Sequence, residues 1–415
     1  MSDPIPVSVI VVSRGRPKAL TRCLTGLAQL LHPAFEIVVV ADPAGIAAIA
    51  DRGGRIKTVG FDEPNISAAR NLGVVQAAGE IVAFIDDDAV PEPTWLTRLT
   101  APFAAPQVVA AGGYVLGRNG ISLQWPPRAV GGDGSHSTLA LDGTAPALFT
   151  GTSQRGIRTE GTNMAFRRDT LAAMGGFDPV FRFYLDETDL NLRLGAVGAV
   201  TAIVPLAQVH HGFAASARRR ADRVPQSLYQ VGASLAAFAR KHGTGDPTPV
   251  LAAELAARRA GLIGHMIAGR IEPRDVQPLL SSLQQGWAEG LARALTPLPP
   301  LPAPVTPFLP FRPPVADRGA RVLAGRRWQA RSLRAQASAL AAQGWRISLY
   351  LFFISAQYHR VRFDPSGFWE QSGGLFGKSV RRGRAVRPWR FDNRLQSEVA
   401  RVALQRGIGE KSTQV

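Results

Sequence analysis

The segment Ile81-Val-Ala-Phe-Ile-Asp-Asp-Asp-Ala-Val-Pro91 decides the fold that we expect for this chain of 415 residues. Its first five residues are apolar and rich in β-branched side chains, which predicts a buried strand of a parallel sheet. Asp86, Asp87 and Asp88 follow directly, and Pro91 prevents the segment from continuing as a central strand. Ligands of open α/β sheets bind beyond the carboxyl ends of the strands, so these acids are expected at a functional site.

Three neighbouring carboxylates repel one another unless a cation or hydrogen-bond donors compensate their charge. Oxygen ligands suit Mg²⁺ or Mn²⁺, and Mg²⁺ is commonly held by one or two carboxylates together with substrate phosphates. The triplet therefore indicates a divalent metal site. The alternative is a solvated acidic turn, because Asp is also a common turn residue.

The composition is that of a chain with a proper core, with 46% hydrophobic and 19% charged residues. Cys23 is the single cysteine, which excludes an internal disulfide and favours a reducing, cytoplasmic compartment. The first residues have no basic segment before an apolar run, so no signal peptide is expected. The best apolar stretch, residues 347–356, is too short to span a membrane.

The net charge of +17 is unevenly distributed. Residues 1–215 contain 17 Lys and Arg against 19 Asp and Glu, whereas residues 216–415 contain 31 against 12. This asymmetry predicts a nearly neutral catalytic or binding module, followed by a part that is attracted to an anionic partner.

The first half alternates between patterns typical of strands and of helices. Strands are expected at residues 7–12, 35–41 and 56–60, and helices at residues 17–30 and 65–77. This order predicts βαβ units, hence a mainly parallel, Rossmann-like sheet flanked by helices. The turn after the first strand is basic, and it has neither a Gly-x-Gly-x-x-Gly fingerprint nor a Walker loop, which disfavours dehydrogenases and P-loop enzymes. Residues 113–158 are expected to form a long loop or hairpin region.

Two further groups of residues suggest chemistry. Asp186 and Glu187 follow the aromatic segment 181–184, which is able to raise the pKa of a carboxylate toward general-base duty. Asp189, one turn before Arg193, is expected to be structural. His210 and His211 follow an apolar strand at residues 200–204, and a metal-ligand role and an ordinary hydrogen-bonding role remain equally open for them.

Taken together, these segments resemble family 2 glycosyltransferases with the GT-A fold, over residues 5–215. The nucleotide half of that family is matched by Ser13-Arg14, Asp42, Ser67-Ala-Ala-Arg-Asn-Leu-Gly73 and Phe84-Ile-Asp-Asp-Asp88. The acceptor half is matched by residues 160–168, Gly175-Gly-Phe-Asp178, Tyr184-Leu-Asp-Glu-Thr-Asp-Leu190 and Val209-His-His211. At least five motifs occur in the order of the family.

The resemblance implies a role for each matching residue. The nucleotide-sugar site would comprise Ser13, Arg14, Asp42, Arg70, Asp86 and Asp87. The metal ligands would be Asp86, Asp88 and His211, or else His210 in place of His211. Thr162 and Asn163 would hold the donor sugar or the acceptor. Glu187 would be the base, with Asp186 as the second candidate, because the family often shows Glu-Asp where this chain has Asp-Glu.

The resemblance also implies a hexosyltransferase that acts in cell-surface glycan or glycoconjugate synthesis. Its partners would be a nucleotide-sugar donor and a glycan or lipid-linked acceptor. With a single base and a metal-bound diphosphate, direct displacement would invert the anomeric centre. Addition of one sugar is favoured over processive synthesis, because Ala324 occupies the Gln position of a Gln-x-x-Arg-Trp motif before Arg327-Trp328.

The second half carries weaker signals. We divide the chain into a GT-A domain (1–215), a helical extension (216–296), a Pro-rich linker (297–315) and a basic, helix-rich C-terminal region (316–415). Helices are expected at residues 214–242, over 249–295 with breaks near Pro273 and Pro278, and at 320–343. The linker contains nine prolines between residues 297 and 314 and is expected to be extended and unpacked.

The apolar segment Ile347–Ile354, flanked by basic residues, has two interpretations. It is either an interfacial segment that contacts an anionic membrane, on the inner face of the cell membrane, or a buried strand or helix. Two other functions stay open for the whole chain. Asp86 also fits the nucleophile of a haloacid-dehalogenase-like phosphatase, although that motif normally lies on a first strand. The basic half alone is compatible with nucleic-acid binding, but no recognised motif supports it, so no nucleic-acid partner is expected.

Overall fold

A computed structural model describes residues 4–380 and 383–409 of the chain. Its largest sheet begins with four parallel strands in the order β3-β2-β1-β4. These are β1 (Val7–Ser13), β2 (Phe35–Ala41), β3 (Lys57–Gly60) and β4 (Ile81–Asp86). Because β1, β2 and β4 are runs of apolar residues buried on both faces, they form the centre of this half of the sheet.

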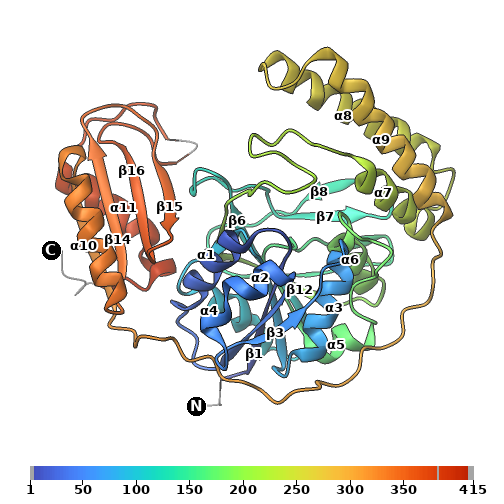
Figure 1. Cartoon of the computed structure of the whole chain (residues 1–415), viewed down its shortest axis with the longest axis horizontal. Helices are drawn as coiled ribbons and strands as arrows, with labels where there is room; N and C mark the ends of the chain where they lie inside the picture. Colours follow the sequence, from blue (N-terminus) through green and yellow to red (C-terminus); the bar gives the residue numbers. More distant parts are fainter. Residues whose placement is uncertain (1–3, 381–382, 410–415) are drawn as a thin grey trace.

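The sheet continues past β4 with a mixture of directions. Strand β11 (Met164–Arg167) is antiparallel to both β4 and β6 (Val108–Leu116), whereas β12 (Val200–His211) is parallel to β6. The short strands β5 (Ala89–Pro91) and β9 (Ala147–Thr150) pair with β12. Figure 1 shows the curled sheet with helices on both faces, so the predicted α/β, Rossmann-like fold is confirmed.

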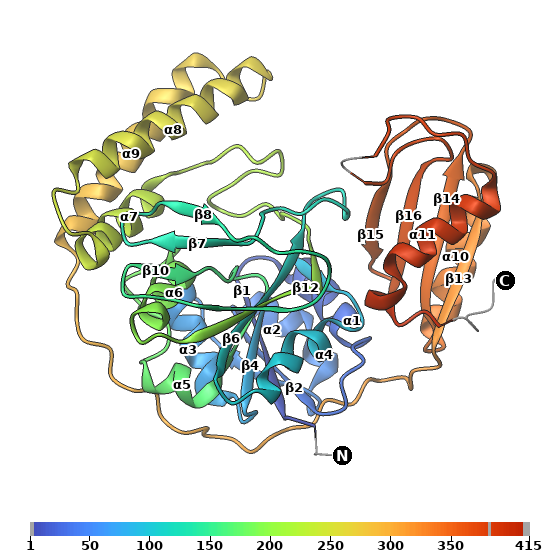
Figure 2. The same cartoon turned by 180° about the vertical axis from the view of Figure 1, so that it is seen from behind.

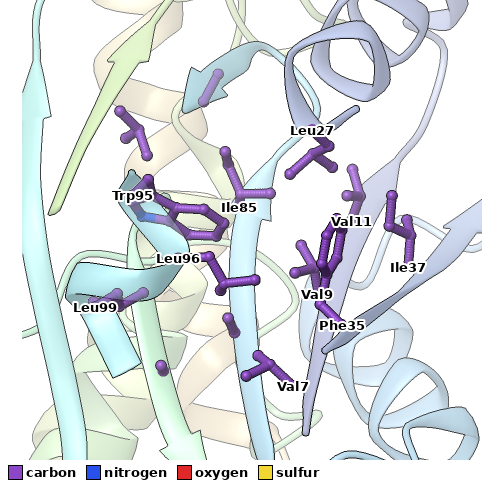
Figure 3. Close-up of a cluster of buried hydrophobic side chains, with 14 of the residues drawn as sticks. Val7, Val9, Val11, Leu27, Phe35, Ile37, Ile85, Trp95, Leu96 and Leu99 are labelled. Atoms are coloured by element: carbon purple, nitrogen blue, oxygen red, sulfur yellow. The ribbon is translucent and has the colours of Figure 1, made fainter. Parts of the chain in front are cut away.

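Helices cover the sheet on two sides. They are α1 (Pro17–Leu27), α2 (Pro43–Ala48), α3 (Ile66–Gln76), α4 (Trp95–Thr100), α5 (Arg168–Ala173) and α6 (Asp186–Ala196). Alternation along β1 sends Val9 and Val11 to a cluster with Ile85 and Trp95, while Ile10 packs on the other face (Figure 3).

The region predicted as a loop or hairpin is a small separate sheet. It consists of β7 (Arg128–Gly131), β8 (His136–Thr138) and β10 (Arg155–Ile157), paired antiparallel in the order β10-β7-β8. The hairpin between β7 and β8 agrees with the expectation. The sheet lies beside α6, because Gly156 approaches the backbone of Asn191 too closely for any side chain.

Three helices follow the large sheet: α7 (Tyr229–His242), α8 (Thr248–Ile267) and α9 (Pro273–Ala292). The prediction of a helix from residue 214 is wrong, because residues 212–228 form an irregular loop that folds back toward the end of β4. Helix α9 also continues through Pro278, where a break was expected. Figures 1 and 2 show α8 and α9 as a hairpin projecting from the molecule.

The Pro-rich linker is extended, as predicted, but it is not free of the rest of the chain. It runs past α5, α3 and the start of β2, where the amides of Leu301, Val305 and Phe311 donate to backbone carbonyls of Ala172, Val75 and Phe35. The ring of Phe311 also lies 5.3 Å from that of Phe35. The expectation of an unpacked spacer is therefore wrong.

The C-terminal region (residues 316–415) contains a third sheet, in the order β13-β14-β16-β15. The strands are β13 (Ala320–Arg326), β14 (Arg346–Phe353), β15 (Arg360–Asp364) and β16 (Phe368–Gly374), covered by α10 (Ala330–Ala342) and α11 (Phe391–Arg406). The predicted helix at 320–343 is therefore a strand followed by a shorter helix.

Strand β14 settles the two interpretations of residues 347–354. It lies between β13 and β16, and Ile347, Leu349 and Leu351 are buried beneath α10. An interfacial segment must present its apolar side chains to lipid, so that interpretation is wrong for the buried residues 347–352, whereas Ile354 lies beyond the strand and is exposed. Among the described residues, the helices include none with the length and apolar character needed to cross a bilayer.

Candidate active site

The acid triplet lies where β4 ends and the chain turns into β5. Asp87 is completely buried and accepts a hydrogen bond of 2.6 Å from the hydroxyl of Ser13, at the end of the neighbouring strand β1. Asp88 is also buried, and its Oδ2 accepts from the backbone amide of Ala214 at 2.7 Å. The carboxylate of Asp86 is about a quarter exposed, so it is the most accessible of the three.

His211 lies beside this triplet because β12 pairs with β5. Its Nε2 is 3.3 Å from Oδ1 of Asp88, and its Nδ1 is 2.9 Å from Oε1 of Gln124, which fixes the orientation of the ring. One ligand atom each from Asp86, Asp88 and His211 lie within 4.8 Å of one another. Two carboxylates and an imidazole at this spacing fit a divalent ion such as Mn²⁺.

His210 points elsewhere. It is buried, and its Nε2 lies 2.8 Å from Oε1 of Glu92. Its ring is 4.4 Å from that of Trp369 in β16, so it belongs to the contact with the C-terminal region. Of the two histidines that the sequence left open, only His211 faces the acids.

Arg16 is a member of this cluster that the sequence did not single out as a site residue. Its guanidinium lies 2.6 Å from Oδ1 of Asp87 and 3.3 Å from Oδ2 of Asp88. Burial nevertheless raises the pKa of Asp87 to about 7, against the opposing charge of Arg16. Burial acts in the same direction on Asp88, but the hydrogen bond and charge of His211 outweigh it and hold the pKa of Asp88 below its usual range.

Asp186 and Glu187 begin α6, immediately after Tyr184 and Leu185, whose backbones are both left-handed (φ 74° and 68°). Such φ values cost energy in residues with a side chain, and they commonly occur at functional sites. Asp186 is buried and paired with Arg70. Glu187 accepts a hydrogen bond of 2.7 Å from Arg158, a residue that the sequence did not single out.

The two carboxylates of this pair differ in their electrostatics. Burial raises the pKa of Asp186 to about 7, although Arg70 opposes the shift. Burial also acts on Glu187, but the charges of Arg158 and Arg70 outweigh it and lower its pKa. Glu187 is therefore ionised at neutral pH.

Arg70 connects the two acidic groups. One of its terminal nitrogens pairs with Asp186, and the other lies 3.5 Å from Oδ1 of Asp86 and 3.2 Å from the carbonyl of Gly161. The resemblance places Arg70 in the nucleotide-sugar site, yet Arg70 is buried among carboxylates. Its position links the end of β4 to the start of α6.

A cavity of about 720 Å³ is lined by Asp86 and Asp88, whereas Asp87, Asp186 and Glu187 are not among its lining residues. Its walls come from the ends of β1 and β4, the start of α3, the loop 212–228, and α8. Its charged lining residues are Arg14, Arg16, Glu63, Asp86, Asp88, Arg182, Arg218, Arg219, Arg223, Glu254 and Arg258. Arginines thus outnumber acids in the lining, which favours an anionic ligand.

The remaining predicted residues differ in their access to this cavity. Ser13 and Arg14 line it, and Arg14 pairs with Asp62 at 2.9 Å. Asp42 is instead the N-cap of α2, accepting from the amide of Gly45 at 3.1 Å, and it also accepts from the amide of Gly15. It therefore shapes the basic turn before α1 and is not among the residues that line the cavity.

Thr162 and Asn163 are neighbours with different surroundings. The hydroxyl of Thr162 donates to Oδ2 of Asp86 at 2.6 Å, which brings it to the metal-ligating acids. Asn163 is completely buried, where it accepts from the indole of Trp95 and donates to the carbonyls of Tyr114 and Ala207. The expected sugar contact is therefore wrong for Asn163, because its side chain is used for hydrogen bonds to α4, β6 and β12 inside the core.

The loop 212–228 contributes cationic groups that the sequence placed on a helix. Phe213 has φ 54°, and its ring lies 4.2 Å from that of His211. The guanidiniums of Arg219 and Arg223 lie 5.7 and 4.3 Å from the ring of Phe213. Nε of Arg219 is buried without a hydrogen-bond partner. The run of three arginines from residue 218 was the available signal, but only the fold places it over the acids.

Comparison with known proteins adds the family. Residues 8–174 match the family model of glycosyl transferase family 2. The chain is 30% identical to the O-antigen biosynthesis protein RfbC of Myxococcus xanthus over 290 residues, which cover 65% of this chain and 22% of RfbC. It is 26% identical to a pre-mycofactocin glycosyltransferase of Mycobacterium tuberculosis, over 57% of this chain and 48% of that protein. The chain thus spans about a fifth and about half of these two relatives.

The solved structure of mannosyltransferase PcManGT from Pyrobaculum calidifontis, in complex with GDP-Man and Mn²⁺, is also similar. It aligns with a TM-score of 0.43 and 17% identity, over 70% of this chain and 88% of the mannosyltransferase. The residues matched by the family model include the acid triplet and Arg70. Residues 8–174 of this chain, about two fifths of its length, thus match glycosyl transferase family 2.

Proposed function

We propose that the protein is a glycosyltransferase that moves a sugar from a nucleotide-sugar donor to an acceptor hydroxyl. The observation that carries the proposal is the convergence of Asp86, Asp88 and His211 at the floor of an arginine-lined cavity. A nucleoside diphosphate is an anion that suits both parts of this site. The family of residues 8–174 supports the same reaction.

The proposed cofactor is Mg²⁺ or Mn²⁺, held by Asp86, Asp88 and His211. When bound, it would neutralise the charge of the departing nucleoside diphosphate as a Lewis acid. Gln124 holds the ring of His211 toward Asp88, and Thr162 holds the carboxylate of Asp86. Arg219 and Arg223 also line the cavity, where they would contact the diphosphate.

Glu187 is the proposed general base, with Asp186 as the second candidate. Its lowered pKa keeps it ionised, so that it can accept the proton of the acceptor hydroxyl. Asp186 is less suited, because it is almost completely buried and its carboxylate is occupied by Arg70. With one carboxylate as the base, the proposed reaction is a direct displacement with inversion.

We further propose that the enzyme is a hexosyltransferase that adds one sugar at a time, in the synthesis of a cell-surface glycan or glycoconjugate in the cytoplasm. The names of RfbC and of the Rhizobium meliloti succinoglycan biosynthesis protein ExoM support this setting. ExoM is 27% identical over 50% of this chain and 67% of its own length. The acceptor in this proposal is a glycan or a lipid-linked saccharide.

The test is a panel of sugar nucleotides, assayed for release of nucleoside diphosphate with and without Mn²⁺. The informative variant is Asp88→Asn, which preserves shape and removes the charge. The matched control is Asp169→Asn, whose side chain is 98% exposed at the start of α5. We expect turnover of one donor that depends on the metal and is lost only in Asp88→Asn. Full activity in that variant, or turnover without metal, would contradict the proposal.

The phosphatase alternative receives less support. Asp86 lies at the end of β4, a central strand with β1 and β11 on either side, and three strands precede it in the chain. Its carboxylate is also engaged by Thr162 and lies near Arg70. Release of inorganic phosphate from a phosphoester by the panel enzyme would revive this alternative.

A further inference from the structure

Two places among the described residues each group several exposed apolar side chains. The first is the rim of the C-terminal region, which we define as residues 326–331, 354–360, 375–380 and 383–390. Its exposed apolar residues are Trp328 (75%), Ile354 (71%), Tyr358 (60%), Val380 (46%) and Val386 (59%). The second is the helical tip, residues 263–274 between α8 and α9, where Ile263 is 37% and Ile267 is 79% exposed.

The rim is formed by the ends of strands that run in the same direction. Arg326 at the end of β13 pairs in register with Phe352 of β14, and Phe353 pairs with Gly374 at the end of β16. The segments that follow these three strands therefore lie side by side at one edge of the sheet. Trp328 and Ile354 come from two of these segments and Val386 from the third.

The rim is also strongly cationic. Its residues include eight Lys and Arg and no Asp or Glu. Several of the arginines lie against aromatic rings: Arg326 is 4.4 Å from Phe391, and Arg387 is 4.3 Å from Trp389. Exposed aromatic and aliphatic side chains among basic ones are the composition of a surface that enters the headgroup layer of an anionic bilayer.

The two places lie on the same side of the molecule. Figures 1 and 2 show the rim and the helical tip at the top of both views, with the loop 212–228 between them. Helix α8 connects the tip to the cavity, because Arg258, Leu262 and His265 line the cavity within about three turns of Ile267. A flat surface that contacts both the rim and the helical tip therefore faces the side of the molecule that carries the cavity.

We propose that the rim and the helical tip together dock the protein on an anionic lipid bilayer. The inference extends the proposed function and rests on it in one respect, since a lipid-linked acceptor would reach the cavity from the membrane side. The apolar residues would enter the interface, and the arginines would pair with anionic headgroups. Part of the basic excess of the second half of the chain thus lies at the rim, away from the buried strand β14.

The experiment is flotation of the full chain with vesicles of neutral phosphatidylcholine, with or without 30 mol% phosphatidylglycerol, at low and high salt (about 0.02 and 0.5 M NaCl). We expect recovery with the anionic vesicles at low salt, reduced at high salt and absent with neutral vesicles. The double variant Trp328→Glu with Ile354→Glu, and the variant Ile267→Glu, each lower the partition about tenfold or more. The matched control is Val197→Glu, a 69% exposed residue at the carboxyl end of α6.

Turnover of the sugar nucleotide is measured on the same variants without vesicles. Unchanged turnover shows that the variants are folded and separates docking from catalysis. The proposal is overturned if the protein does not float with anionic vesicles or if the rim and tip variants float like the wild type. It is also overturned if Val197→Glu lowers recovery with the vesicles as much as the rim and tip variants do. Salt-sensitive binding to duplex DNA without vesicle binding would also overturn it, in favour of a nucleic-acid surface.

Discussion

His210 and His211 are neighbours on β12, but their side chains serve opposite sides of the strand. Nε2 of His211 lies 3.3 Å from Asp88 and faces the cavity, whereas Nε2 of His210 lies 2.8 Å from Glu92. Glu92 in turn pairs with Arg406 at 3.1 Å, from helix α11. The candidate metal ligand is therefore carried by a strand whose other face is held by the C-terminal region.

Substitution of the two histidines should separate these roles. His211→Ala removes a ligand atom, so the Kd for Mn²⁺ should rise at least about tenfold. His210→Ala should leave this Kd unchanged and lower the free energy of unfolding by about 1–3 kcal/mol, because Glu92 loses a buried partner. Isothermal titration with Mn²⁺ and urea unfolding measure the two effects. Equal loss of metal affinity in both variants would contradict the division of roles.

Glu187→Gln tests the proposed base. The variant should lower kcat by about 10²–10⁴-fold, since the acceptor hydroxyl loses its proton acceptor, with nucleotide affinity retained. The isosteric comparison is Asp186→Asn, which weakens the pairing with Arg70 and should lower the free energy of unfolding by about 1–3 kcal/mol. Pre-steady-state transfer rates of the two variants, measured at equal fractions of folded protein, show which carboxylate is the base. A larger loss of rate in Asp186→Asn would reverse the assignment.

Arg219→Ala tests the loop over the acids. The guanidinium is poised at the cavity with an unpartnered nitrogen, so its removal should raise the Kd of the nucleoside diphosphate–Mn²⁺ complex roughly ten- to hundredfold. The control is Arg220→Ala in the same loop, because Arg220 pairs with Asp222 at 2.8 Å and does not line the cavity. Equal affinity in the two variants would show that Arg219 does not contact the diphosphate.

The ionisation of Glu92 should make the free energy of unfolding depend on pH in the acid range. Burial alone would raise its pKa, but Arg406 and His210 lower the pKa of Glu92 to about 2. Unfolded Glu titrates near about 4.3, so below that pH the unfolded state binds more protons. Ionised Glu92 therefore contributes about 3 kcal/mol at neutral pH, which is lost as the pH falls from about 5 to about 2.

Urea unfolding of the wild type and of Glu92→Gln at a series of pH values isolates this contribution from that of other carboxylates. The difference between the two proteins should be largest at neutral pH and should shrink toward zero near pH 2. A difference that is independent of pH would mean that the charge of Glu92 does not stabilise the contact with α11.

Several misread segments have a common physical cause. Residues 320–326 contain arginines and alanines that favour helices, but pairing with β14 makes them a strand. Residues 347–354 carry an apolar run whose length fits an interfacial segment or a core strand equally well, and only the covering helix α10 distinguishes them. In both cases the deciding contacts come from distant parts of the chain.

The sequence by itself determined the parallel strands, the placement of Asp86, Asp87 and Asp88 at a strand end, and the family, because these depend on local apolar runs and on motifs in a fixed order. Only the tertiary structure decided that His211 and not His210 joins the acids, that Asn163 is buried in the core, and that Arg16 and Arg219 face the cavity. Those outcomes depend on strand pairing and on the path of a loop. Neighbouring side chains on a strand point to opposite faces, and the faces acquire their identity only when the rest of the chain packs against them.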